Sequence, residues 1–191
     1  MSDYLDDFVP CLHEILRDNS MDRRIKLPAL HALGDLCMYS GDQFSQKYFE
    51  STITIFDQAS RMSVQVQNHN DETLEFLSEL RETILDQYII ILISLQDTNS
   101  EDKFIAHLQN VFDFMQTTVT IEGRKSPRVL KVVLGLIGDI ASTFPSNAGV
   151  KAKCTESWVE QCILYLQSLP EAEFKDQASY TLNAIKKSMA S

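Results

Sequence analysis

The stretch HALGDLCMYSGDQF at residues 31–44 has a counterpart further along the chain, GLIGDIASTFPSNA at residues 135–148. Both stretches continue a run of apolar residues at helical spacing, and both carry a Gly-Asp pair. Each run ends at a residue that commonly terminates a helix, Gly41 in the first and Pro145 in the second. A helical pattern that recurs within one chain indicates a repeat architecture, in which neighbouring units stack to bury their apolar faces.

Outward from these two stretches, apolar residues recur at i, i+3 and i+4 along most of the chain, which predicts helices. The isoleucine-rich stretch YIIILISL at 88–95 keeps the period of its segment, so we expect a helix there and no strand. The predicted helices cover about residues 4–17, 24–39, 46–61, 72–95, 104–115, 129–144, 156–169 and 174–189.

Eight helices in 191 residues make four pairs, which we place at about 3–41, 42–97, 98–145 and 146–191. The length of a pair is close to the period of HEAT-type repeats, about 40–47 residues. The predicted fold class is therefore all-α, a single right-handed α-solenoid of about four HEAT-type helical pairs.

Composition excludes several classes of function. Lys and Arg number 17 against 27 Asp and Glu, which gives a net charge of −10. An acidic chain repels nucleic acid and anionic lipid and attracts basic partners. No apolar run approaches the ~20 residues of a membrane span, so we expect no membrane insertion. With only 6 Gly and 5 Pro, the chain is poor in the turns that a many-stranded β-fold needs.

The residue types that carry catalysis or bind metals are scattered. The histidines lack an HxxxH spacing, the cysteines lack a CxxC spacing, and GRKS at 123–126 lacks the frame of a phosphate-binding loop. We therefore predict no enzyme, no cofactor and no metal site. His31 is expected to be a structural histidine beside apolar positions, and the cysteines are expected to be reduced core residues of an intracellular protein, namely Cys11, Cys37, Cys154 and Cys162.

The segment 72–95 carries an unusual charge pattern. At about 100° per residue, five carboxylates fall in a stripe roughly 80° wide, opposite the apolar face. Its only base, Arg81, lies away from the stripe. Like charges at i, i+4 repel, whereas a solvated face usually interleaves bases. The stripe is either such a solvated face or a ridge that binds a basic partner, and it consists of Glu72, Glu75, Glu79, Glu82 and Asp86.

Most aromatic side chains fall on apolar helix faces, where core packing explains them. Phe114 lies off the main apolar stripe of its helix. We therefore expect an exposed position for Phe114, with a shallow site for an apolar peptide beside it.

The ordered series of helices, with LSELRETILDQYIIILISLQD at 77–97 and VLGLIGDIASTFP at 133–145, resembles the C-terminal HEAT repeats of importin-β (karyopherin-β). The resemblance implies a fragment of a nuclear import receptor, whose concave second helices wrap the basic importin-α adaptor helix or a basic cargo. That role falls to the five carboxylates of the stripe, to Asp35 and Asp139 of the Gly-Asp pairs, and to Tyr180. At the last position animal relatives look to carry a tryptophan, and the tyrosine keeps a weaker cation–π surface.

The resemblance also implies contact with Phe-Gly nucleoporins and a location in the cytoplasm, the nucleus and the nuclear pore. It places the main Ran-GTP contacts in N-terminal repeats that this chain lacks. An alternative function from a different class is a HEAT scaffold or adaptor of a multiprotein assembly, such as a phosphatase regulatory subunit. A scaffold is expected to bind a folded partner with little dependence on salt.

Overall fold

The computed structural model describes residues 2–18, 20–65, 71–122 and 126–191, so that of the GRKS loop only Ser126 is described. Throughout these ranges the regular structure is helical, with no strand. The chain divides into two compact units, unit 1 at Met1–Ala106 and unit 2 at His107–Ser191. The boundaries predicted for the four helical pairs stay a prediction.

Unit 1 contains five α-helices among its described residues, followed by a 3₁₀ turn. Their bounds are α1 (Ser2–Arg17), α2 (Arg23–Ser40), α3 (Asp42–Lys47), α4 (Phe49–Ser63), α5 (Asp71–Asp97) and η1 (Glu101–His107). Gly41 ends α2 as expected, with a φ of 48° that favours glycine. The stretch at 88–95 is helical throughout, so the prediction of a helix there is confirmed.

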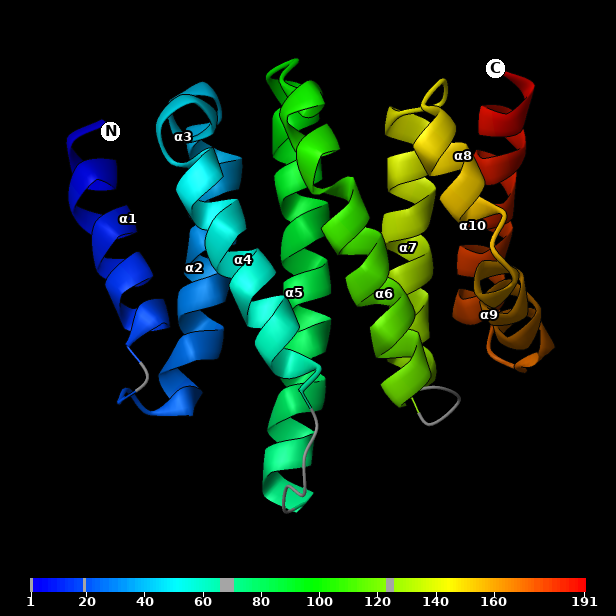
Figure 1. The fold of residues 1–191 in the computed structure, drawn as a ribbon, viewed down its shortest axis with the longest axis horizontal. Helices are drawn as coiled ribbons and strands as arrows, with labels where there is room; N and C mark the ends of the chain where they lie inside the picture. Colours follow the sequence, from blue (N-terminus) through cyan, green and yellow to red (C-terminus); the bar gives the residue numbers. More distant parts are fainter. Residues whose placement is uncertain (1, 19, 66–70, 123–125) are drawn as a thin grey trace. The chain divides into compact units, whose positions relative to one another are not determined.

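Helices α2 and α5 lie side by side in unit 1, with α1 beside α2 and α4 packed across α5 (Figure 1). The core between α4 and α5 contains a buried polar contact, in which the Tyr88 hydroxyl donates to Asp57 at 2.8 Å. The Tyr88 ring meets Phe56 and Phe104 edge to face. Because the Tyr88 ring is buried and its hydroxyl is hydrogen-bonded, α5 is held in one rotation about its axis, and this rotation determines which face of α5 points outward.

Arg81 reinforces this arrangement. Its side chain is 2% exposed, and its Nε and Nη2 atoms donate to the carbonyl oxygen of Ser63, at 3.0 and 2.7 Å. The guanidinium thus satisfies the last turn of α4, where a cation also complements the helix dipole. The prediction that Arg81 lies away from the acidic stripe is confirmed.

Unit 2 contains α6 (Leu108–Glu122), α7 (Pro127–Thr143), α8 (Ala148–Cys154), α9 (Ser157–Ser168) and α10 (Ala172–Ala190). Its closest pairing joins α7 to α10, and α9 packs against both. The Thr181 hydroxyl of α10 donates to the carbonyl oxygen of Leu134 at 2.7 Å, which fixes the register of the two helices. Ser188, two turns later, donates in the same way to the carbonyl oxygen of Pro145 at 3.1 Å.

Several expectations from the sequence are wrong in detail. The helix expected at 46–61 is interrupted at Tyr48 between α3 and α4, and the one expected from Phe104 begins as the 3₁₀ turn η1. Phe114, expected at the surface, is only 4% exposed, so the apolar site proposed beside it is withdrawn. Cys11 is exposed, whereas the other cysteines are buried as expected.

Candidate functional site

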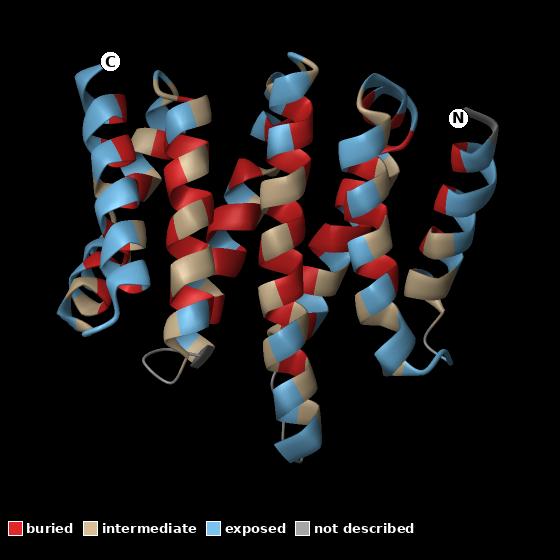
Figure 2. Ribbon diagram, turned by 180° about the vertical axis from the view of Figure 1, so that it is seen from behind, coloured by how far each residue is buried: buried red, intermediate tan, exposed pale blue. Residues whose placement is uncertain are grey.

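The five carboxylates of the predicted stripe, here called the acidic ridge, lie along the face of α5 that points away from the core of unit 1. The opposite face of the helix is buried through Leu77, Ile84 and Tyr88. Figure 2 shows the gradient along α5, from an exposed N-terminal end to a half-buried middle. Accordingly, the first three members of the ridge are exposed and the last two are half-buried, in the order Glu72, Glu75, Glu79, Glu82 and Asp86.

Ion pairing divides the acidic ridge. Within the described residues, Glu75, Glu79 and Glu82 have no basic partner within salt-bridge distance, which agrees with the pattern in the sequence. Glu72 differs, because its Oε1 atom accepts from Arg23 of α2 at 2.7 Å. The same guanidinium donates to Thr73 at 2.9 Å. The sequence placed no base within the segment on the stripe, and the base that pairs with the ridge, Arg23, comes from the neighbouring helix α2.

The inner end of the ridge meets α2. Burial, followed by repulsion from Glu82, raises the pKa of Asp86, while the nearby His31 acts in the opposite direction. His31 is exposed, contrary to the expectation of a packed histidine, and its Nδ1 atom lies 3.3 Å from the amide nitrogen of Gln87. Asp35 follows one turn after His31 and is also exposed, so it belongs to the same outward face of α2.

Sequence reasoning overlooked an aromatic side chain on this face of unit 1. Tyr39 follows Asp35 by one further turn and is 81% exposed. Its spacing from His31 and Asp35, four residues at each step, was visible in the sequence and indicates a common helix face. An acidic face with an exposed aromatic ring suits a basic partner, because aromatic faces attract cations as carboxylates do.

The two remaining predicted residues meet one another in unit 2. The Tyr180 hydroxyl of α10 donates to Asp139 of α7 at 2.5 Å, and the ring stays 45% exposed. A Cβ on Gly138 would lie 2.6 Å from Cε1 of Tyr180, so only glycine lets the ring settle over α7 in this position. Burial raises the pKa of Asp139, and burial together with the hydrogen bond to Asp139 raises the pKa of Tyr180 to about 12.

A pocket of about 270 Å³ opens in unit 2 between α6, α7 and α9. No charged side chain lines it among the described residues. Two aromatic rings dominate the lining, and one of them belongs to the only tryptophan of the chain. We name it the Trp158 pocket, after a lining that includes Val119, Leu130, Trp158, Cys162 and Tyr165.

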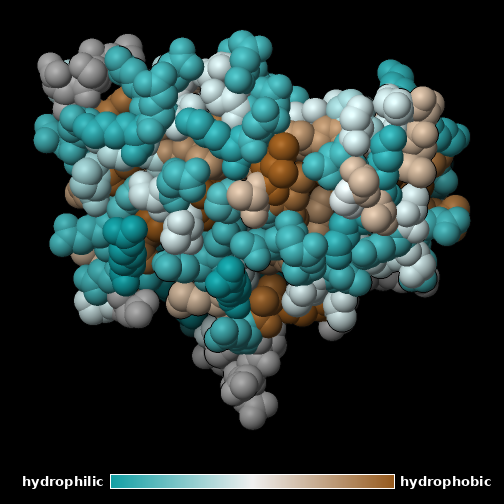
Figure 3. Space-filling view, turned by 45° about the horizontal axis from the view of Figure 1, so that its top comes forward, coloured by the Kyte–Doolittle hydropathy of each residue, from teal (hydrophilic) through white to brown (hydrophobic). Residues whose placement is uncertain are grey.

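The described residues hold neither a cluster of metal ligands nor a helix that could span a membrane. Nowhere in these ranges do three His, Cys, Asp or Glu side chains gather as metal ligands would. None of the helices in the same ranges has the length and apolarity needed to cross a bilayer. The face of the molecule in Figure 3 is mostly hydrophilic, with hydrophobic residues in separate patches.

These helices define the class of the protein as an all-α repeat protein of the HEAT type. A solved structure of yeast importin-β (Kap95p) shares the fold, with a TM-score of 0.82 and 23% identity over 98% of this chain. Kap95p in a structure with RanGDP gives a TM-score of 0.84 over 100% of the chain, at 22% identity. A Kap95:Nup1 complex gives 0.80 over 98%, also at 22% identity. The predicted fold class is confirmed.

Sequence comparison narrows the class to a family. The family model described as importin subunit beta-1-like, TPR repeats, matches residues 1–167. The chain belongs to this importin-β family, as the resemblance in the sequence predicted. Importin subunit beta-1 of Schizosaccharomyces pombe is 26% identical over 96% of this chain, and that of Arabidopsis thaliana is 23% identical over 98%. The chain spans about a fifth of the length of these relatives, 21% of each.

Proposed function

We propose that this chain is part of a nuclear import receptor, acts without catalysis in the cytoplasm and nucleus, and binds a basic helix through the acidic ridge. The importin-α adaptor helix or a basic cargo would supply that helix. The observation that carries the proposal is the run of Glu75, Glu79 and Glu82, which share one face and have no basic partner among the described residues. Like charges at this spacing repel by a few tenths of a kcal/mol per pair, and a basic ligand would relieve that repulsion.

The dimensions of the ridge suit a helix as ligand. At 1.5 Å per residue, Glu75 and Asp86 are about 16 Å apart along α5, the length of three helical turns. Lys or Arg residues spaced by one turn on a partner helix would face successive carboxylates. Asp35 and Tyr39 of α2 would widen the surface on one side. Because most of these groups are exposed, each contact is worth only about 0.2–1 kcal/mol, and affinity would come from their number.

Tyr180 and Asp139, which lie in unit 2, would form a second point of contact with the basic partner. The hydrogen bond to Asp139 orients the phenol ring, and the exposed ring face is available to a Lys or Arg side chain. A cation over such a ring is worth about 0.5–1 kcal/mol at an exposed site. Asp139 would act mainly through Tyr180, because its carboxylate already accepts a hydrogen bond from the phenol hydroxyl.

The Trp158 pocket supports a second candidate function, contact with Phe-Gly nucleoporins. Its lining is uncharged and aromatic, and phenylalanine is an uncharged aromatic side chain. The Kap95 neighbour in complex with Nup1 belongs to the same fold. Trp158 offers an intrinsic probe, since its emission should change when a Phe-Gly peptide is added and stay constant with a matched Ser-Gly peptide. Constant emission with both peptides would count against this candidate.

A labelled basic helix tests the main proposal by fluorescence anisotropy, at low and at physiological salt. We expect binding that weakens as salt rises, because the screening length falls from about 30 Å at about 0.01 M salt to about 8 Å at physiological ionic strength. The variant Glu75→Lys, Glu79→Lys, Glu82→Lys should lose this binding and keep its helical circular dichroism.

A matched control reverses three exposed carboxylates off the ridge, with Asp102→Lys, Glu160→Lys and Glu171→Lys. The control carries the same change in net charge, so it separates a local site from general attraction to an acidic chain. Equal loss in both variants would contradict the assignment of the ridge. Binding of a folded partner with little salt dependence would instead favour the alternative, a HEAT scaffold or adaptor.

A further inference from the structure

A second pocket, in unit 1, differs from the Trp158 pocket in its charge. Its volume is about 420 Å³, within the range of ligand pockets. It is formed where α1 and α4 end and α2 and α5 begin, at the end of unit 1 that lies lowest in Figure 1. No residue of the acidic ridge lines it, and the two surfaces meet where Glu72 pairs with Arg23 of the lining.

The interior of this pocket is apolar. Leu30 and Leu77, both buried, form part of the wall, together with Leu80 and Phe76. Two methionines with large exposed fractions also line it, Met21 at 41% and Met62 at 57%. Methionine side chains are flexible and polarizable, which makes them frequent in surfaces that adapt to apolar side chains of a partner.

Three cations line the same pocket, and no carboxylate does so among the described residues. They are Arg17 at the end of α1, and Arg23 and Lys26 in the first turns of α2. Arg23 is partly neutralised by Glu72, and the Lys26 ammonium donates to the carbonyl oxygen of Leu16 at 3.3 Å. Arg17 is exposed and has no ion pair within the described residues. A basic lining is unexpected in a chain with a net charge of −10, which carries 27 acidic residues.

We propose that this pocket, here called the basic-rimmed pocket, binds a peptide segment in which a bulky apolar residue is flanked by Asp or Glu. The apolar side chain would enter between Leu30 and Leu77, against the adaptable methionines. The flanking carboxylates would meet Arg17 and Lys26 at the rim. Charge complementarity selects this occupant over a basic helix, which Arg17 would repel, and over a neutral Phe-Gly segment, which would leave the cations unused.

The test uses the full chain and three labelled peptides of equal length, followed by fluorescence anisotropy. The first peptide carries a single Phe flanked by Glu, the second replaces that Phe by Ala, and the third replaces each Glu by Ser. We expect the first to bind most tightly. Loss of the apolar anchor should weaken binding by more than about tenfold, since burial of such a side chain contributes about 1.5–3 kcal/mol.

Two variants locate the site. Ala59→Phe places a large ring in the pocket, because Ala59 lines it, and should reduce binding at least as strongly as loss of the anchor. Arg17→Glu should weaken binding of the acidic peptide by about fivefold, which corresponds to the upper end of the free energy that an exposed ion pair contributes. The exposed Arg24, which lies outside the lining and pairs with Asp22, gives the matched control Arg24→Glu.

Circular dichroism verifies that each variant is folded. If Ala59→Phe unfolds the chain, Arg17→Glu still tests the site, because it changes an exposed residue at a helix end. Equal binding of the Glu and Ser peptides would overturn the proposal in favour of a neutral segment. Equal loss in Arg17→Glu and Arg24→Glu would overturn it as well, because attraction would then be general to the surface.

Discussion

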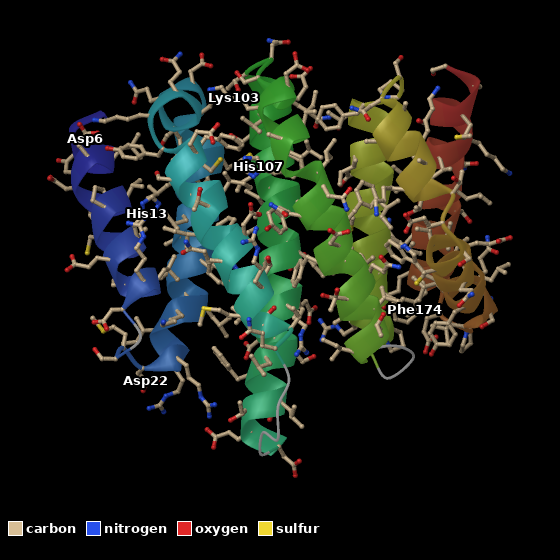
Figure 4. The ribbon with its side chains drawn as sticks, viewed as in Figure 1. Asp6, His13, Asp22, Lys103, His107 and Phe174 are labelled. Carbon is tan, nitrogen blue, oxygen red and sulfur yellow. The ribbon has the colours of Figure 1, made fainter. Side chains whose placement is uncertain are left out.

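His13 should make unit 1 less stable in mild acid than at neutral pH. It lies on α1, is 5% exposed, and its Nε2 atom is 3.0 Å from the hydroxyl oxygen of Thr52 on α4 (Figure 4). Burial, and secondarily the positive charge of Arg17, lowers the pKa of His13 from 6.5 to about 4. Between these two values the unfolded chain binds a proton that the folded chain excludes. Stability is therefore full above pH 6.5, falls as the pH is lowered toward 4, and changes no further below that value.

The magnitude follows from the shift. Each pKa unit corresponds to about 1.36 kcal/mol, so a shift of about 2.5 units amounts to roughly 3 kcal/mol once both states are protonated. At pH 5 the folded state is still mostly neutral and the unfolded state mostly charged, which gives a loss of about 2 kcal/mol relative to pH 7.5. A loss of this size is a large share of the stability of an ordinary domain, about 5–15 kcal/mol.

Urea unfolding followed by circular dichroism, at pH 7.5 and at pH 5, measures this loss. The variant His13→Gln keeps a group that can hydrogen-bond to Thr52 and removes the titration. Between pH 7.5 and pH 5, the free energy of unfolding should therefore decrease in both chains, but the decrease should be about 2 kcal/mol smaller in the variant. Titration of the His13 ring near pH 6.5 in the folded chain, observed by NMR, would refute the reasoning.

Three further substitutions test the packing described above. Gly138→Ala should displace the Tyr180 ring, and this overpacking should lower the free energy of unfolding by about 1–3 kcal/mol. The higher helix propensity of alanine should offset about 1 kcal/mol of that loss, and urea unfolding measures the net change. Arg81→Met should lower the unfolding free energy by about 1–3 kcal/mol, because the carbonyl of Ser63 loses a buried charged donor. Tyr180→Phe should raise the pKa of Asp139 further, because the phenol hydrogen bond lowers it, and NMR titration of the carboxyl measures the change.

Helical periodicity was enough to predict the fold class, since the apolar faces of α2, α5, α7 and α10 are long and regular. It failed where local geometry departs from 3.6 residues per turn. The 3₁₀ turn η1 advances about 120° per residue, which shifts the phase of every later residue on an α-helical wheel. Ile105, within this turn, is 41% exposed. Phe114 lies in the regular helix α6 and is buried together with Phe112 and Met115, so α6 buries a wider face than its apolar stripe indicates. Helix α8, seven residues long, is too short to establish a period.

The candidate site was predictable within a single helix and less so between helices. Positions on α5 follow from the wheel, and the exposed Glu75 and Glu79 agree with it. Glu72 pairs with Arg23, which lies 49 positions away on another helix. The periodicity of a single helix cannot predict such a contact. The basic-rimmed pocket was missed for the same reason, because its lining comes from four helices and its cations are distant from the buried Leu77 in sequence.

The glycines of the two Gly-Asp pairs have the same packing role, whereas the surroundings of the two aspartates differ. A Cβ on Gly34 would lie 1.8 Å from Oε1 of Gln87, and one on Gly138 would lie 2.6 Å from Cε1 of Tyr180. In both units the glycine therefore lets a large side chain of the neighbouring long helix settle against the backbone, which is the reason for its recurrence.

The aspartates that follow the two glycines differ in what their neighbours offer. In unit 2 the neighbouring helix brings a phenol to Asp139, whose carboxylate is thereby engaged. In unit 1 the neighbouring helix brings Gln87 to Gly34, and Asp35 stays exposed with no ion pair within the described part of the chain. A basic partner would find a free carboxylate at Asp35 and an oriented ring at Tyr180. If both were plain ligands, Asp35→Asn and Asp139→Asn would weaken a basic helix equally. We expect instead that Asp139→Asn weakens binding less than Asp35→Asn does, because an amide oxygen can still accept from the Tyr180 hydroxyl and keep the ring oriented.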